Sequence, residues 1–184
     1  MAKKVKDLRM THTKQSLING FFSLVNKKDF EKITIADITK VARVNRATFY
    51  AHFKDKYDLI DYIMEDFATF SIDNHVSDVM IFNQESITQL ILAVHDFYQE
   101  PNVECRSSYA GTVLPQMREK ILKELNLVLS KSLNDIYGDS EKAIFVPIFA
   151  QMIHEGALQL TCSNNTRLKG ELAKKIALFI NGRH

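Results

Sequence analysis

Two short helices separated by a tight turn constrain the fold of this chain more than any other feature. The segment ITIADITKVARVNRATFYAHF contains two helix start signals. Thr34 can cap the first helix, with Asp37 in the position of a capping box, and Asn45 can cap the second, from Arg46 to about His52. Helices of about two turns are not stable alone, so both must pack against neighbouring helices.

Two adjacent aromatic residues divide the second of these helices into an inner and an outer face. Phe49 and Tyr50 point about 100° apart on a helix, so only one ring can enter the core. We expect Phe49 to pack inward and Tyr50 to point outward. Ala47 and Ala51 lie nearly opposite Phe49, which leaves a flat outer face. This pattern predicts a helix-turn-helix, whose second helix enters the major groove of DNA.

The polar residues around this flat face suit contact with DNA. Arg46 and Thr48, near the start of the helix, carry the donors and the methyl group used in base recognition. The phenol of Tyr50 can donate to a phosphate oxygen, and His52 extends the polar set. Lys56 is expected in the first turn of the next helix, where backbone N–H groups also favour a phosphate.

Charge is distributed unevenly along the sequence. Residues 1–58 carry 13 Lys and Arg against 6 Asp and Glu, whereas residues 59–184 carry 11 against 16. A basic first third on an acidic remainder favours a module that binds a polyanion. The alternative is that the basic residues only form a solvated surface.

The rest of the chain also has helical periodicity, and the prediction is an all-α protein. Hydrophobic residues make up 46% of the 184 residues, enough for a sizeable core. We expect a DNA-binding domain over residues 1–54, with the recognition helix at about 45–52, and a helical regulatory and dimerisation domain over residues 55–184. Outside the helix-turn-helix, helices are expected over residues 13–26, from Asp55, and over 86–98, 115–137, 140–161 and 166–180.

From about Thr13 to Phe67 the sequence resembles the TetR/AcrR family of bacterial transcription regulators, most specifically in the run TFYAHFKDK. The resemblance implies a three-helix DNA-binding domain followed by a larger helical domain for ligand binding and dimerisation. It implies DNA contacts from Thr34, Asn45, Arg46, Ala47, Thr48, Tyr50, His52 and Lys56.

Arg43 departs from the family pattern, which usually has glycine in this turn. Either the turn is slightly altered or Arg43 takes a positive φ, at a cost of about 1–2 kcal/mol. Arg43 is itself a further candidate for a phosphate contact.

The last two helices, about residues 141–161 and 167–181, resemble the dimer interface of the family. The first of them is apolar nearly all round, and Ala150, Gly156 and Ala157 are small enough for close helix contact. Pro147 is expected to bend it. These features predict a homodimer on a palindromic operator. The alternative is a central core helix in a monomer.

The predicted function is a transcriptional regulator, expected to be a repressor that leaves double-stranded DNA when an unidentified small-molecule effector binds. The alternative is a co-regulator or adaptor whose C-terminal domain binds a protein. An enzyme is not expected, because His154-Glu155 lacks the second histidine of a zinc motif and Leu158 stands in its place. We expect no cofactor and no metal.

The sequence assigns no ligand site and no operator sequence. Several helical residues could line a pocket or equally fill the core: Phe67, His95, Tyr98, Tyr109, Met117 and Met152. The weakly patterned segment 102–113 could be a gate or a loop. Without a signal peptide, an apolar run of about 18 residues or a metal-type spacing of its two cysteines, the chain is expected to be cytoplasmic, with no membrane partner.

Overall fold

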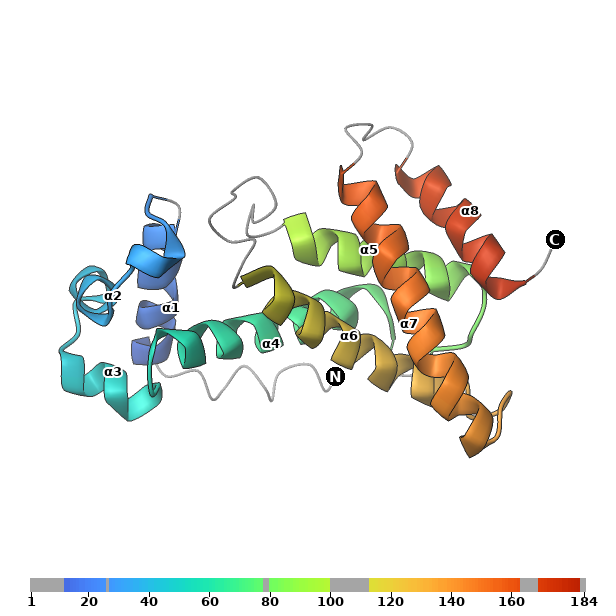
Figure 1. Ribbon diagram of the computed structural model, residues 1–184, viewed down its shortest axis with the longest axis horizontal. Coiled ribbons are helices and arrows are strands. Elements are labelled where there is room, and N and C mark those ends of the chain that lie inside the picture. Colours follow the sequence, from blue (N-terminus) through green and yellow to red (C-terminus); the bar gives the residue numbers. More distant parts are fainter. Residues whose placement is uncertain (1–11, 26, 78–79, 100–112, 163–168, 183–184) are drawn as a thin grey trace. The chain divides into compact units, whose positions relative to one another are not determined.

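The computed structural model describes residues 12–25, 27–77, 80–99, 113–162 and 169–182. Within these ranges the chain forms eight α-helices and one short 3-10 helix, with no strand (Figure 1). The predicted all-α fold is confirmed. The chain divides into two compact units, Met1–Ile63 and Met64–His184. The boundary falls inside helix α4, which runs Lys56–His75.

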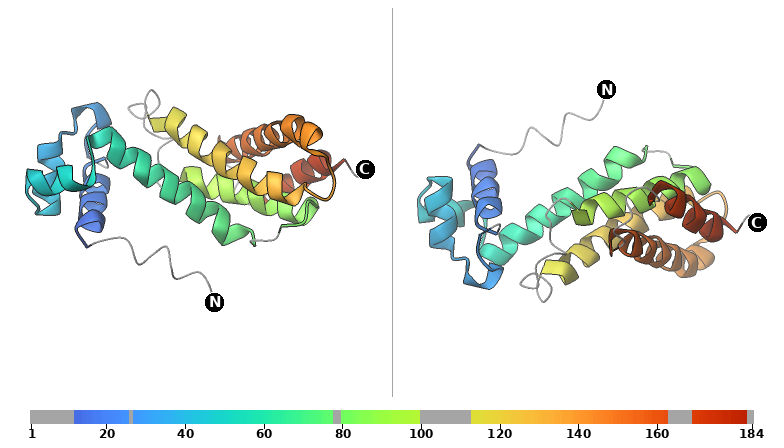
Figure 2. Two further views of the ribbon diagram at one scale, coloured as in Figure 1. Left: turned by 90° about the horizontal axis from the view of Figure 1, so that it is seen from below. Right: turned by 90° about the horizontal axis from the view of Figure 1, so that it is seen from above.

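The first unit is built around one apolar core. It contains α1 (His12–Val25), the 3-10 helix η2 (Phe30–Lys32), α2 (Ile35–Ala42) and α3 (Arg46–His52), which gather as a compact group in both views of Figure 2. The first turns of α4 complete it. Leu17, Phe30, Ile38 and Phe49 are fully buried. The two short helices therefore gain their stability from packing, as their length requires.

Gly20 of α1 permits a close approach between α1 and α2. A Cβ atom built on Gly20 would lie 3.2 Å from the backbone nitrogen of Ala42 and 3.2 Å from the carbonyl oxygen of Ile38. Both atoms belong to the backbone of α2, which cannot rotate away as a side chain can. The absence of a side chain at Gly20 therefore sets the spacing of α1 and α2.

The second unit contains the remainder of α4, α5 (Gln84–Gln99), α6 (Val113–Ser132), α7 (Asp139–Cys162) and α8 (Lys169–Asn181). Helix α5 packs against α7 and α8, and α7 also contacts α6 and α8. Leu90, Val94, Phe97 and Ile153 are completely buried in this core.

Helix α6 ends five residues earlier than the sequence indicated, at Ser132 instead of Tyr137. The amide N–H groups of Ile136 and Tyr137 both donate to the carbonyl oxygen of Leu133, which forms a turn. Asn134, Asp135 and Gly138 are residues that favour turns over helix. Leu133 is buried at the start of this turn, so its apolar side chain continues the pattern of α6 and makes the helix look longer in the sequence.

Helix α7 is strongly apolar along its length, as its sequence predicted. Its most apolar stretch lies between Asp139 and Thr161, and 33% of that stretch is buried within the chain. By length and composition alone it is long and apolar enough to cross a membrane, a test that the core helix of a folded protein also passes, and Gln151, His154 and Glu155 interrupt its apolar run. Pro147 lies inside the helix.

Three small residues of α7 contribute to packing within the chain. Ala150 and Ala157 are completely buried, and a Cβ atom on Gly156 would lie 3.0 Å from the side chain of Ile176 in α8. Their small size is thus explained by internal helix contacts and is not evidence for a dimer.

Five of the six residues that could line a pocket or fill the core lie in the described part of the chain, and all five are buried or partly buried. His95, Tyr98 and Met117 are buried, and Phe67 and Met152 are partly buried. Tyr109 and the segment 102–112 lie outside the described residues, and Val113 is the first residue of α6.

Replacement of Gly20 by alanine should destabilise the protein, although alanine is the better helix former. The added methyl group would have to push α2 away from α1, and overpacking of this kind costs about 1–3 kcal/mol. Gly170→Ala is the matched control, because a Cβ atom at Gly170 of α8 meets nothing within 4 Å. Urea unfolding followed by circular dichroism measures both variants, and equal stabilities would contradict this account of Gly20.

Candidate nucleic-acid interface

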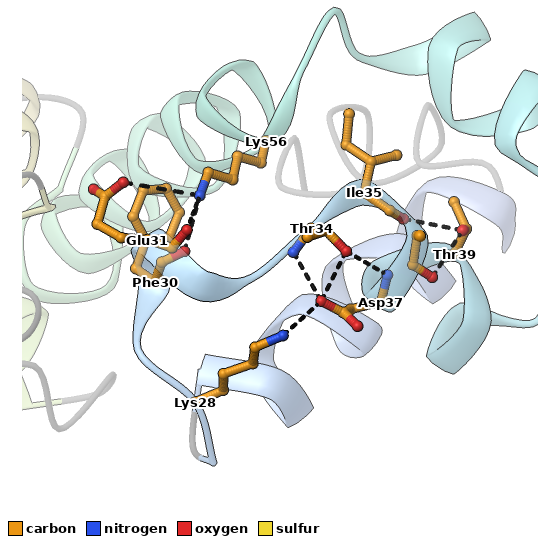
Figure 3. Close-up of polar contacts among 9 residues, drawn as sticks. Lys28, Phe30, Glu31, Thr34, Ile35, Asp37, Thr39 and Lys56 are labelled. Atoms are coloured by element: carbon orange, nitrogen blue, oxygen red, sulfur yellow. Dashed lines mark hydrogen bonds and ion pairs between the residues drawn. The ribbon is translucent and has the colours of Figure 1, made fainter.

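The first turn of α2 is fixed by a complete capping box (Figure 3). The Asp37 amide donates to Thr34 Oγ1 at 3.1 Å, and the Thr34 amide donates to Asp37 Oδ2 at 2.9 Å. Lys28 Nζ also reaches Asp37 Oδ2, at 2.8 Å. These hydrogen bonds, from Lys28 first and then from Thr34, hold the pKa of Asp37 well below its ordinary value. Thr34 is exposed, but its hydroxyl serves as a helix cap.

The turn between α2 and α3 contains a left-handed backbone conformation that glycine usually adopts. Arg43 has φ 56° and ψ 39°, and it is the one non-glycine residue with positive φ in the described ranges. Its amide donates to the Lys40 carbonyl, and the Val44 amide donates to the Thr39 carbonyl, which together form a Schellman motif. Of the two possibilities left by the sequence, the turn is therefore retained and Arg43 carries strain of about 1–2 kcal/mol.

Helix α3 has the two faces that the spacing of its residues predicted. Phe49 is fully buried, whereas Tyr50 is 49% exposed. Ala47 and Ala51 are exposed on the flat side. The structure therefore brings a small-residue surface to the outside of α3 while one phenyl ring holds the helix in the core.

The polar residues at the start of α3 are ordered by hydrogen bonds among themselves. Asn45 Oδ1 accepts from the Thr48 amide at 2.7 Å and from the Thr48 hydroxyl at 2.8 Å. Arg46 Nη2 donates to the phenol oxygen of Tyr50 at 3.3 Å. This contact uses Tyr50 as an acceptor, so the phenol O–H can still donate to another group.

Most of the predicted DNA contacts are exposed, and all of them lie in the first unit. Exposed side chains belong to Thr34, Arg43, Asn45, Arg46, Ala47 and Tyr50, and partly buried ones to Thr48, His52 and Lys56.

The start of α4 differs from the expectation that its N–H groups are open to a phosphate. Asp55 Oδ1 accepts from the Tyr57 amide and from the Asp58 amide, both at 2.8 Å. A carboxylate of the chain itself thus occupies these two donors. The ammonium of Lys56 is also engaged, because it donates to the carbonyl oxygens of Phe30 and Glu31, each at 3.0 Å. The sequence had no signal for these last two bonds, since the partners are 25 and 26 residues away.

A second lysine of this unit is committed in a way that the sequence did not indicate. Lys14 Nζ of α1 lies 3.5 Å from the ring centroid of Tyr62 and 5.4 Å from that of Phe53. Contacts of a cation with an aromatic face are favourable, and this one connects α1 to α4 within the first unit.

His154 and Glu155, the pair with some resemblance to a catalytic motif, belong to the core of the second unit. His154 is completely buried, and its Nε2 lies 2.9 Å from the hydroxyl of Tyr98 in α5. Burial lowers the pKa of His154, so the neutral imidazole is favoured. Among the described residues, no group of three or more His, Cys, Asp and Glu side chains is arranged to hold a metal ion.

Residues 17–63 match the family model described as bacterial regulatory proteins, tetR family. The first unit carries a TetR-family helix-turn-helix domain. The chain is 37% identical over 60 residues to the uncharacterized HTH-type transcriptional regulator YxbF of Bacillus subtilis (strain 168), and 32% identical over 63 residues to the dhaKLM operon transcriptional activator DhaS of Lactococcus lactis. The two matches cover 32% and 34% of this chain, but only 16% and 34% of these relatives.

Solved structures of other proteins extend the likeness in fold to nearly the whole chain. The dihydroxyacetone kinase operon activator DhaS has a TM-score of 0.63 at 18% identity, covering 91% of this chain and 93% of that one. FadR of Bacillus subtilis, solved in complex with stearoyl-CoA, has a TM-score of 0.61 at 14% identity and covers 92% and 99%. At these identities the likeness concerns the fold. The predicted TetR resemblance, with an N-terminal helix-turn-helix and a helical remainder, is confirmed.

Proposed function

We propose that this chain is a homodimeric, cytoplasmic transcription regulator that binds a palindromic operator through α3. The observation that carries the proposal is the division of α3 by the buried Phe49, in a domain that matches the TetR family. Residues 1–54 would bind DNA, and residues 55–184 would carry dimerisation and regulation. A dimer presents two recognition helices to half-sites about 34–36 Å apart, so the expected operator is palindromic.

The exposed face of α3 supports direct recognition of bases. Arg46, in the first turn, can donate in pairs to guanine, the commonest specific contact in the major groove. Ala47 is flat enough to let the helix backbone approach the base edges. Tyr50, oriented by Arg46 at 3.3 Å, can donate its hydroxyl to a phosphate.

Replacement of Arg46 by alanine should weaken binding to the upstream region of the gene roughly 5- to 150-fold, the equivalent of about 1–3 kcal/mol, and reduce the preference over random DNA. Tyr50→Phe should cause a smaller loss on both DNAs, because it removes one phosphate donor. Lys131→Ala, at an exposed site of α6, is the control. Gel-shift titrations measure these affinities, and equal binding by wild type and Arg46→Ala to specific and random DNA would count against the proposal.

The dimer is supported by apolar side chains that the chain leaves uncovered on its last two helices. Ile144 and Ile148 of α7 are 61% and 47% exposed, and Phe179 of α8 is 68% exposed. Helices α7 and α8 pack against each other, and large apolar side chains left exposed on neighbouring helices favour an interface. We therefore propose that a second copy covers them.

Replacement of Ile148 by lysine should convert the dimer to a monomer, because a buried charge at the interface has no partner there. Phe70→Lys is the matched control, since Phe70 of α4 is 64% exposed but lies outside the last two helices. Sedimentation velocity distinguishes the two states. A dimer that persists in Ile148→Lys, or a wild-type protein that is monomeric, would exclude this interface.

We further propose that the regulator is a repressor released by a small molecule bound in the second unit. FadR, one of the structural neighbours, was solved with stearoyl-CoA, which supports a ligand of this general size. Release follows if the ligand binds one conformation of the dimer more tightly than the DNA-bound one. The alternative is an adaptor whose second unit binds a protein partner.

A thermal-shift titration with fatty acyl-CoA esters of several chain lengths should give saturable stabilisation by at least one of them. At a concentration 100 times its Kd, such a ligand adds about 2.7 kcal/mol to stability. The same ester should reduce operator binding, and free coenzyme A is the control. The absence of any shift, together with co-elution of a protein from native lysate, would favour the adaptor.

A further inference from the structure

We infer that Lys56 is a positioning residue of the DNA-binding unit, whose ammonium fastens the first turn of α4 to the 3-10 helix before α2. This inference rests on the proposed DNA-binding function. It assigns to Lys56 a contribution different from the phosphate contact that its place in the TetR resemblance implies.

The surroundings of Lys56 leave little of it available to solvent or DNA. Its side chain is 14% exposed, and its Nζ lies 3.0 Å from the carbonyl oxygens of both Phe30 and Glu31. Figure 3 shows the side chain extending from α4 toward these two residues. A lysine ammonium has three donors, so two of them are used here. The Glu31 carboxylate, 4.0 Å away, adds favourable charge.

Lys56 adds a second hydrogen bond to one of the carbonyl oxygens that it contacts, that of Phe30. Helices end in carbonyl groups without intrahelical partners, and these groups carry partial negative charge. The Phe30 carbonyl accepts one hydrogen bond from the Ile33 amide at 3.0 Å, and Lys56 supplies the second. Both acceptor positions of this oxygen are therefore filled.

Tyr57, the next residue of α4, contacts the same two residues of η2. Its ring packs edge-on against Phe30 with centroids 5.4 Å apart, and its hydroxyl donates to Glu31 Oε2 at 3.2 Å. Partial desolvation, followed by the hydrogen bond to Glu31, raises the pKa of Tyr57. Lys56 and Tyr57 of α4 with Phe30 and Glu31 of η2 are called the Lys56 clamp below.

The Lys56 clamp acts at the entry to the helix-turn-helix. From η2 the chain passes through the buried Ile33 to Thr34, which caps α2. After α3, the chain returns to α4 through the short segment 53–55. The pair α2 and α3 is thus attached to the first turn of α4 at both ends, covalently after α3 and through the clamp before α2. With the clamp open, only the covalent attachment after α3 would remain.

A phosphate would have only the third donor of Lys56 to meet, on an ammonium already held by two carbonyl groups and on a side chain that is 14% exposed. Arg43 offers the contrasting case, because it is exposed and, within the part of the chain that the structure describes, its guanidinium makes no such pair of carbonyl contacts. Removal of one cation at each position therefore separates positioning from phosphate binding.

The decisive variant is Lys56→Met, which removes the ammonium and retains the length of the stem. In the free protein, hydrogen exchange at the Ile33 amide should accelerate, because this amide donates to the carbonyl that loses its second donor. Operator affinity should fall about tenfold at every salt concentration, so that the slope of log affinity against log salt stays at the wild-type value. Arg43→Gly, which suits the left-handed turn, should lower that slope by about 0.9 for each subunit and leave Ile33 exchange unchanged.

The opposite pattern would overturn the inference. If Lys56→Met lowers the salt slope by about 0.9 for each subunit while Ile33 exchange stays at the wild-type rate, Lys56 is a phosphate ligand. Tyr57→Phe, which deletes only the hydroxyl, should give a smaller acceleration at Ile33 and serves if Lys56→Met does not fold. If wild type binds no DNA, the proposed function fails, and exchange at Ile33 in the free protein still decides whether the clamp exists.

Discussion

Burial of Phe49 is the interaction on which the rest of the DNA-binding unit depends. Helix α3 has seven residues and cannot persist without tertiary contacts. Phe49 is its fully buried residue, and its ring lies 5.9 Å from that of Phe53 and 5.7 Å from that of Tyr50. Loss of such a ring from a core costs about 3–5 kcal/mol. The direction of every polar side chain on α3 follows from this one orientation.

The basic side chains of the first unit have two kinds of role: some stabilise the fold, and others are exposed to solvent. The net charge of the unit does not distinguish them. Lys28 is bound to the capping carboxylate of Asp37, Lys32 to Asp29 and Lys56 to backbone carbonyls. Lys14 lies over the ring of Tyr62. These side chains hold the unit together. Arg43 and Arg46 are exposed at the turn and at the start of α3, and they are better placed to meet a polyanion. A count of charges along the sequence cannot separate the two groups.

Part of the exposed apolar surface of the second unit lies on a helix that also packs its core. Helix α7 places Ala150, Ile153 and Ala157 inside and Ile144 and Ile148 outside. A helix that is apolar on two faces buries one of them in the core of the chain, and the other is favourably buried only against another molecule. The proposed dimer supplies that cover, whereas the buried Tyr98–His154 pair joins α5 to α7 inside the unit.

The sequence by itself determined the helices of the first unit, their caps and the inner and outer faces of α3. The bounds of α2 and α3, the capping box of Thr34 and the burial of Phe49 follow from residues within one or two turns of each other. Only the tertiary structure decided the partners of Lys56, the need for glycine at position 20 and the burial of His154, because these depend on segments far apart in the sequence. It also decided where α6 ends, since a buried Leu133 continues the apolar pattern after the backbone has turned. Local rules fix which residues form a helix, and packing fixes what their side chains then touch.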